Sequence, residues 1–131
     1  MPDRSGRAST PMPGARDISL LTADRNMIQQ LSAPELKAMI DGGVPFEFID
    51  VRTERERDIA RIDGSRLLDQ AYHDYLLALD RQTMLVFQCH HGIRSQAAAE
   101  YCRGLGFVRL FNLRGGIDAW SQLVDPVVPR Y

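Results

Sequence analysis

The chain has 131 residues, which is enough for one ordinary domain and too few for two. Its composition of 44% hydrophobic, 25% charged and 8% aromatic residues is that of a globular protein with one core, and excludes a disordered or collagen-like chain. Lys and Arg total 16 and Asp and Glu total 17, so the net charge of −1 gives no general attraction to nucleic acid or to anionic membranes.

The first 26 residues contain several Pro and Gly residues and mixed charges but few clustered aliphatic side chains, so we predict a flexible leader over residues 1–26. Its arginines leave a transit peptide as an alternative, although Asp3, Asp17 and three prolines argue against an amphipathic presequence. No apolar run exceeds four residues and there are only two cysteines. We therefore expect neither a membrane span nor a disulfide framework, and predict a cytoplasmic protein with reduced thiols.

From residue 27 onward, strand-like and helix-like segments alternate. Ser32 and Glu35 form a capping-box sequence that predicts a helix start, and Gly42 and Gly43 predict its end. The apolar segment 84–88 has the length and character of a strand buried on both faces, so it is predicted to be the central strand. Strands are predicted at 27–31, 46–51, 66–68, 84–88 and 109–113, and helices at 32–41, 52–58, 72–79, 95–104 and 116–123.

This alternation predicts an α/β domain over residues 27–124, with a largely parallel sheet covered by helices on both faces. Within the charged segment 52–58, ion pairs between neighbouring turns are expected, such as Glu54 with Arg57. Pro126 and Pro129 mark a C-terminal tail, residues 125–131, in which ordered structure is predicted to end.

The segment between the central strand and the next helix is the most informative for chemistry. Cys89 ends the strand, and in a parallel sheet the crevice lies beyond the carboxyl ends of the strands. Gly92 permits a tight turn into the helix. The loop amides, the helix N-terminus and the Arg94 guanidinium are expected to surround the sulfur with positive charge and to hold Cys89 as a thiolate near neutral pH. The alternative is a small buried cysteine with only a packing role.

The second cysteine and the two histidines give weaker signals. Cys102 lies among apolar positions of its helix and is expected to pack in the core, too far along the helix for a disulfide with Cys89. His90 and His91 beside Cys89 suggest a metal site. However, three adjacent residues cannot easily wrap one ion, and the spacing shows no outlying Cys or acidic ligand, so no metal is predicted.

Asp50 and Arg52 lie at the end of another apolar strand and can reach the same crevice as Cys89. We expect them either to orient the active loop or to line the entrance for an anion, with simple solvation of the loop as the alternative. Trp120 is expected to pack in the core.

Taken together, these segments resemble the rhodanese family of single-domain sulfurtransferases over roughly residues 27–124. The resemblance rests on Asp50-Val51-Arg52, on the six-residue loop Cys89–Arg94 with its inner residues His90, His91, Gly92 and Ile93 and the following Ser95, on Gly104-Leu105-Gly106-Phe107, and on Gly115-Gly116-Ile117-Asp118-Ala119-Trp120. It implies a three-layer fold with a five-stranded parallel sheet between helices, and an active loop that cradles a persulfide. The segment Ala60–Ser65 departs from the family pattern.

The reaction expected from the resemblance is sulfur transfer by covalent catalysis. The Cys89 thiolate takes a sulfane sulfur from thiosulfate or a persulfide donor, and a thiol, cyanide or protein cysteine then accepts it, without a metal or organic cofactor. One alternative is a phosphatase or arsenate reductase of similar architecture, whose loop has one more residue between Cys and Arg. Another is a non-catalytic docking or sensing module of the same family, although such modules typically lose the nucleophile, which is present here.

Overall fold

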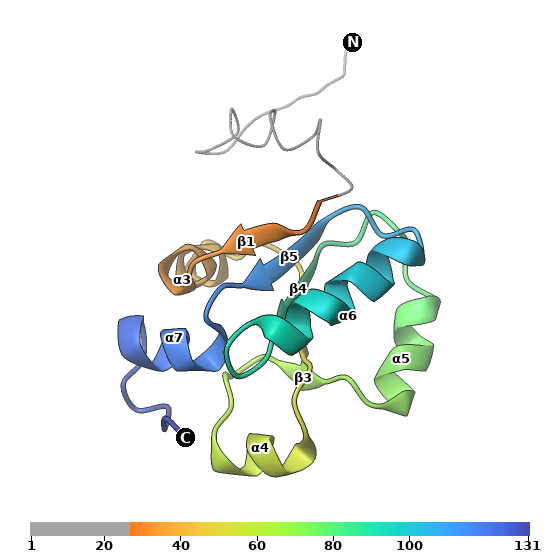
Figure 1. Cartoon of the computed structure of the whole chain (residues 1–131). Coiled ribbons are helices and arrows are strands. Elements are labelled where there is room, and N and C mark those ends of the chain that lie inside the picture. Colours follow the sequence, from red (N-terminus) through yellow and green to blue (C-terminus); the bar gives the residue numbers. More distant parts are fainter. Residues whose placement is uncertain (1–26) are drawn as a thin grey trace.

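The computed structural model describes residues 27–131, so the predicted leader over residues 1–26 lies outside the described residues. Five strands and five helices alternate along this part of the chain (Figure 1). The strands are β1 (Gln29–Leu31), β2 (Glu47–Asp50), β3 (Arg66–Leu67), β4 (Leu85–Gln88) and β5 (Leu110–Leu113). The helices are α3 (Ala33–Asp41), α4 (Glu54–Ile59), α5 (Gln70–Leu77), α6 (Ile93–Gly104) and α7 (Gly116–Leu123).

The strands form one parallel sheet in the order β1-β5-β4-β2-β3. Strand β4 lies at the centre and all four of its residues are buried, which confirms the central strand predicted from its apolar run. In the register of the sheet, Asp50 pairs with Gln88 and Phe87 pairs with Asn112. The carboxyl ends of β2, β4 and β5 therefore meet at one edge, and the loops that follow them lie close together.

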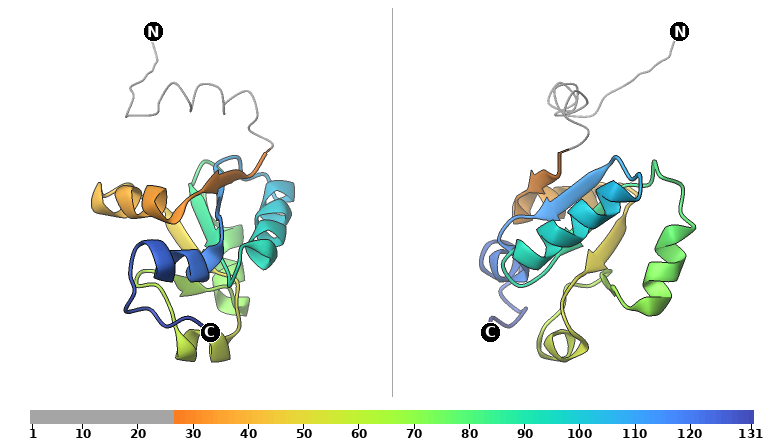
Figure 2. Two further views of the ribbon diagram at one scale, coloured as in Figure 1. Left: turned by 60° about the vertical axis from the view of Figure 1, so that its left-hand side comes forward. Right: turned by 45° about the vertical axis from the view of Figure 1, so that its right-hand side comes forward.

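Helices cover both faces of the sheet, giving three layers (Figures 1 and 2). The two hydrophobic cores are separated by the sheet because alternate residues of each strand point to opposite faces. One core joins β2 and β4 to α5 and α6, and includes Ile49, Tyr72, Leu76, Phe87, Ala99 and Cys102. The other joins the opposite face to α3 and α7, and includes Leu36, Phe48, Val86, Leu113, Ile117 and Trp120.

Several boundaries follow directly from local sequence signals. The Ser32 hydroxyl accepts a hydrogen bond from the Glu35 amide at 3.1 Å, and the Glu35 carboxylate accepts one from the Ser32 amide at 2.7 Å. This reciprocal cap starts α3 where the sequence predicted it. Helix α7 spans the predicted residues 116–123. No helix among the described residues has the length and apolar character needed to cross a bilayer.

The prediction that order ends at the prolines of the tail was wrong. Val128 is buried in the core beneath α3 and α7, and the Ser121 hydroxyl of α7 donates to its carbonyl at 2.5 Å. Tyr131 reaches the loop that follows β4, where its ring stacks on His90. Proline stops a helix or a strand, but it does not prevent a turn from bringing apolar side chains back onto the domain.

Candidate active site

Cys89 follows the last residue of β4, and its side chain lies at the start of α6. The backbone amides of Gly92 and Ser95 donate to its Sγ at 3.1 and 3.3 Å, and the Ser95 hydroxyl oxygen lies 3.2 Å from it. The side chain is 1% exposed. The turn into α6 thus aims hydrogen-bond donors at one sulfur atom, at the end of the helix where the macrodipole favours an anion.

The backbone packing around Cys89 depends on glycine at two positions. Gly92 has a φ of 100°, and a Cβ there would lie 3.3 Å from the Gly115 amide nitrogen and 3.4 Å from the Leu113 carbonyl oxygen. At Gly116, a Cβ would lie 2.3 Å from the carbonyl oxygen of Cys89, which accepts a hydrogen bond from the Ile117 amide at 2.8 Å. The Gly115-Gly116 pair therefore lets the start of α7 dock against the backbone of the nucleophile.

The surroundings of Cys89 shift its acidity in two opposing directions. Burial raises the pKa of the thiol, whereas hydrogen bonds from the Ser95 hydroxyl and from the amides of Ser95, Gly92 and His91 lower it. The hydrogen bonds outweigh burial, so the pKa of Cys89 lies below its ordinary value. A thiolate is the nucleophilic form of cysteine, and a lower pKa increases the fraction of thiolate at a given pH.

Asn112 supports the cradle from β5, and sequence reasoning missed it. Its side chain is buried, accepts a hydrogen bond from the Ser95 hydroxyl at 2.5 Å and donates to the Gly92 carbonyl at 3.0 Å. Ser95 has one hydroxyl hydrogen, so it donates either to Asn112 or to the Cys89 sulfur. Because a thiolate can only accept, ionisation of Cys89 makes the sulfur a partner for that hydrogen. An asparagine inside the otherwise apolar strand segment Leu110–Leu113 was the available signal.

The Arg94 guanidinium, which was predicted to add positive charge around the sulfur, is paired with an acid in the structure. It forms a two-pronged ion pair with the Glu56 carboxylate, at 2.7 and 2.9 Å. Hydrogen bonding to Arg94 holds the pKa of Glu56 well below its ordinary value, and the same contact raises the pKa of Arg94. The loop therefore carries its arginine already paired with an acid of α4.

Glu56 is fixed by several groups and is the second residue that sequence reasoning missed. Its carboxylate accepts from the Thr53 amide at 3.2 Å, completing the capping box of α4, and from the Tyr131 hydroxyl at 2.7 Å. Tyr131 also stacks its ring on that of His90, with centroids 3.9 Å apart. The tail thus connects α4 to the active loop.

Asp50 and Arg52 do not line an entrance beside Cys89. Both are buried and form an ion pair with an Nη2–Oδ2 distance of 2.8 Å. Arg52 also donates to the Ala60 carbonyl at 2.7 Å and to the Tyr131 hydroxyl at 3.0 Å. Arg57 completes the cluster through Asp50 at 2.7 Å, in place of the predicted pair with Glu54. These residues brace α4 and the tail, because a buried carboxylate requires several donors.

His90 and His91 stack on each other with ring centroids 3.9 Å apart. The fold brings Asp118 of α7 to them, with His91 Nε2 and Asp118 Oδ2 4.0 Å apart. These three residues could hold a metal ion, since their ligand atoms all lie within 4.8 Å of one another. Spacing along the chain did not reveal Asp118 as a neighbour of the two histidines, because the fold rather than the sequence brings it there. Arg130 already binds the Asp118 carboxylate at 2.9 Å, so this acid has another partner in the structure.

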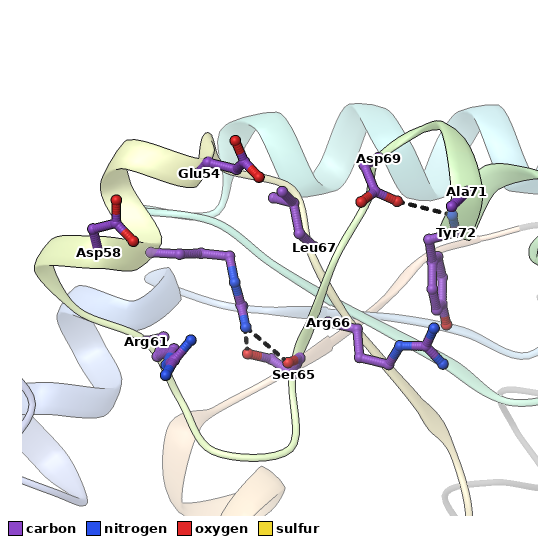
Figure 3. Close-up of a pocket in the computed structure, with 10 residues that line it drawn as sticks. Glu54, Asp58, Arg61, Ser65, Arg66, Leu67, Asp69, Ala71 and Tyr72 are labelled. Carbon is purple, nitrogen blue, oxygen red and sulfur yellow. Dashed lines mark hydrogen bonds between the residues drawn. The ribbon is translucent and has the colours of Figure 1, made fainter.

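A separate pocket lies between α4, β3 and the start of α5 (Figure 3). Both acidic and basic side chains line it, and none of the predicted site residues does. Its lining residues are Glu54, Arg57, Asp58, Arg61, Ser65, Arg66, Leu67, Asp69, Ala71 and Tyr72.

The structure has a parallel five-stranded sheet with a cysteine at the turn from the central strand into a helix, and this arrangement is that of an α/β domain with a cysteine-centred active loop. The family model of the Rhodanese-like domain matches residues 32–123, and the chain belongs to this family of sulfurtransferases. This confirms the predicted resemblance and fold.

Two curated proteins and one solved structure illustrate the relationship. The chain is 37% identical over 73 residues to the thiosulfate sulfurtransferase GlpE of Ectopseudomonas mendocina, covering 55% of this chain and 67% of that protein. It is 33% identical over 100 residues to the probable adenylyltransferase/sulfurtransferase MoeZ of Mycobacterium tuberculosis, covering 74% of this chain but only 26% of MoeZ. A rhodanese-like domain protein from Staphylococcus aureus superposes with a TM-score of 0.64 at 25% identity, covering 79% of this chain and 99% of that one.

Proposed function

We propose that this protein is a sulfurtransferase that carries a sulfane sulfur as a persulfide on Cys89. The observation that carries the proposal is the set of amide and hydroxyl donors directed at the Cys89 sulfur from the start of α6. Catalysis at this site uses the electrostatic stabilisation of an anion by groups that are already oriented. The likeness to GlpE, a thiosulfate sulfurtransferase, supports the same reaction class.

In the first half-reaction, the Cys89 thiolate attacks the outer sulfur of the donor. A bond forms between the two sulfur atoms while the S–S bond of the donor breaks. The electron pair of the broken bond leaves with sulfite when thiosulfate is the donor, or with a thiolate when a persulfide is the donor. The transferred sulfur remains on Cys89, where the amides of the loop residues His91, Gly92 and Ser95 stabilise the negative charge.

In the second half-reaction, cyanide, a small thiol or a protein cysteine attacks the terminal sulfur and the Cys89 thiolate leaves. The same donors stabilise the thiolate as it forms again, so the site serves both halves of the cycle. Ser95 and Gly92 act at the sulfur, while Arg94, His90, His91 and the exposed Ile93 surround its approach. Asp50 and Arg52 act by bracing α4. Both cysteines are free thiols, which suits a reducing compartment such as the cytoplasm.

The test is a comparison of substrate classes with the purified protein. Steady-state transfer of sulfur to cyanide is measured with thiosulfate and with a low-molecular-weight persulfide, and hydrolysis of an aryl phosphate and reduction of arsenate are measured in parallel. We expect turnover only with the sulfur donors, because the loop donors converge on a single sulfur atom. Phosphatase or arsenate reductase turnover that exceeds sulfur transfer would reverse this choice, and no turnover with any substrate would favour a non-catalytic docking module.

A further inference from the structure

Two arginines beside the active loop are each paired with an acid. Arg94 binds Glu56 through both prongs of its guanidinium, and Arg130 binds Asp118 beside His91. The sulfur itself meets backbone amides and a hydroxyl, which carry partial charges only. An arriving anion therefore finds the guanidinium groups of Arg94 and Arg130 already paired with carboxylates.

The two donor classes differ in the charge that they bring to this site. Thiosulfate carries two negative charges, so its reaction with the Cys89 thiolate places a total charge of −3 in the transition state. The terminal sulfur of a persulfide carries at most one negative charge, and with the perthiol protonated the total is only −1. In that case the thiolate attacks R–S–SH, the S–S bond breaks, R–S⁻ leaves and Cys89–S–SH forms. The first reaction needs a compensating cation far more than the second.

We propose that Glu56 determines the donor preference of the site by occupying the Arg94 guanidinium, which disfavours thiosulfate relative to the persulfide of a thiol. This inference rests on the proposed sulfurtransferase function and names its donor class. Arg94 is the arginine of the active loop, and Glu56 of α4 binds it from outside the loop. Glu56 thus affects the choice of sulfur donor indirectly, through its ion pair with Arg94.

The Glu56 carboxylate is held in place by several groups, so its pairing with Arg94 does not change over the neutral pH range. The carboxylate is held by Arg94, by the Tyr131 hydroxyl and by the Thr53 amide, and its side chain is only 17% exposed. Arg94 lowers the pKa of Glu56 far enough for it to remain ionised throughout the neutral range. Arg94 therefore stays paired under all conditions in which the Cys89 thiolate reacts.

The experiment uses Glu56→Gln, because glutamine can still complete the capping box of α4 and accept from the Thr53 amide. Glu54→Gln is the matched control: it lies in the first turn of the same helix, removes the same charge and has no contact with Arg94. The kcat and KM of the full chain are measured with thiosulfate and with cysteine persulfide, and thermal unfolding of each variant checks the fold. Arg94→Gln and the double variant complete the cycle.

We expect Glu56→Gln to lower KM for thiosulfate by about fivefold or more, because a freed guanidinium attracts the dianion at short range. Its kcat/KM for cysteine persulfide should change by less than about twofold, and Glu54→Gln should leave both donors unchanged. In the Arg94→Gln background the effect of Glu56→Gln on thiosulfate should disappear. An equal change for both donors, or an unaltered effect without Arg94, would overturn the inference. Failure of the wild-type protein to take sulfur from either donor would instead count against the proposed function.

Discussion

Cys89 and Cys102 lie near opposite ends of helix α6, and both side chains are buried. The pKa of Cys89 nevertheless lies below its ordinary value, whereas the pKa of Cys102 lies above it. Burial raises the pKa of Cys102 to about 11, with the charge of Arg81 as the opposing influence. At Cys89 burial also raises the pKa, but hydrogen bonds from Ser95 and from the loop amides more than offset it. Exclusion from water therefore does not decide the chemistry of a cysteine. The decisive difference is whether unpaired N–H groups of a helix start point at the sulfur.

The two regions also differ in what surrounds them. Cys102 belongs to the hydrophobic core with Ala99 and Phe107, where a neutral side chain packs best. Cys89 lies where β4, α6 and α7 meet, and the Ser95 hydroxyl beside its sulfur is itself hydrogen-bonded to Asn112 of β5. A packing site and the proposed reactive site are therefore joined by one helix of twelve residues. The predictions below test this contrast, beginning with the largest expected effect.

Substitution of each cysteine by serine should separate the two roles completely. Cys89→Ser removes the sulfur that becomes the persulfide, so transfer from thiosulfate to cyanide should fall by at least about a thousandfold. Cys102→Ser should retain activity within about twofold, at some cost in stability because a hydroxyl replaces a buried thiol. Steady-state rates and thermal unfolding are the measurements. Substantial transfer by Cys89→Ser would remove Cys89 from the reaction.

Gly92→Ala should disturb the reactive site through the backbone. The position has a φ of 100° and the added Cβ meets backbone atoms at 3.3 and 3.4 Å, so we expect a loss of about 2 kcal/mol in unfolding free energy. Gly64→Ala is the matched control, with a φ of 88° but nothing within 4 Å of the added Cβ; it should lose only about 1 kcal/mol. Denaturant unfolding measures both variants.

Activity distinguishes the two glycine variants further. Gly92→Ala should also lower sulfur transfer, because its amide donates to the Cys89 sulfur, whereas Gly64→Ala should not. Equal losses of stability together with unchanged activity in Gly92→Ala would show that the turn tolerates a side chain, and that the close backbone approach is unimportant.

Ser95→Ala should have a smaller effect that depends on pH. Removing the hydroxyl removes a contribution that lowers the pKa of Cys89, so that pKa rises and less thiolate is present at a given pH. At pH values below the pKa of Cys89 in both the wild type and the variant, the variant should react about fivefold more slowly. At pH values above both pKa values, the two rates should converge. The pH profile of single-turnover persulfide formation measures this.

Ser121→Ala is the control for that profile. Ser121 is also a buried serine, but its hydroxyl donates to the Val128 carbonyl and lies outside the proposed site. This variant should lose stability without moving the pH profile. A profile that shifts equally in both variants would mean that Ser95 acts only through the fold.

The sequence predicted correctly the features that depend on neighbouring residues, such as strands, helix starts and turns. The central strand followed from an apolar run, the start of α3 from its capping box, and the turn around Cys89 from a strand end followed by Gly92. The contacts that sequence reasoning missed join residues far apart in the chain: Glu56 with Arg94, Asn112 with Ser95 and Tyr131 with His90. Each depends on where the sheet order places a side chain, and composition and spacing do not encode that order.

Asp50 and Arg52 show that the sequence can predict where a residue lies without predicting where its side chain points. Their position at a strand end correctly predicted that they lie at the carboxyl edge of the sheet. It did not predict the orientation of their side chains. The pair turns toward the Ala60 carbonyl and the tail because these offer hydrogen-bond partners to buried charges. The tail was missed because its prolines suggested an end to order, whereas Val128 and Tyr131 return to the domain.

The most direct test of the central claim is the mass of the protein after reaction with a sulfur donor. The full chain is treated with thiosulfate or a low-molecular-weight persulfide, freed of excess donor, and examined by intact mass spectrometry and peptide mapping. We predict one added sulfur atom per chain, located on the peptide that contains Cys89 and removed by cyanide or a reductant. Absence of the added sulfur with every donor, or its presence on Cys102, would contradict the claim that Cys89 is the sulfur carrier.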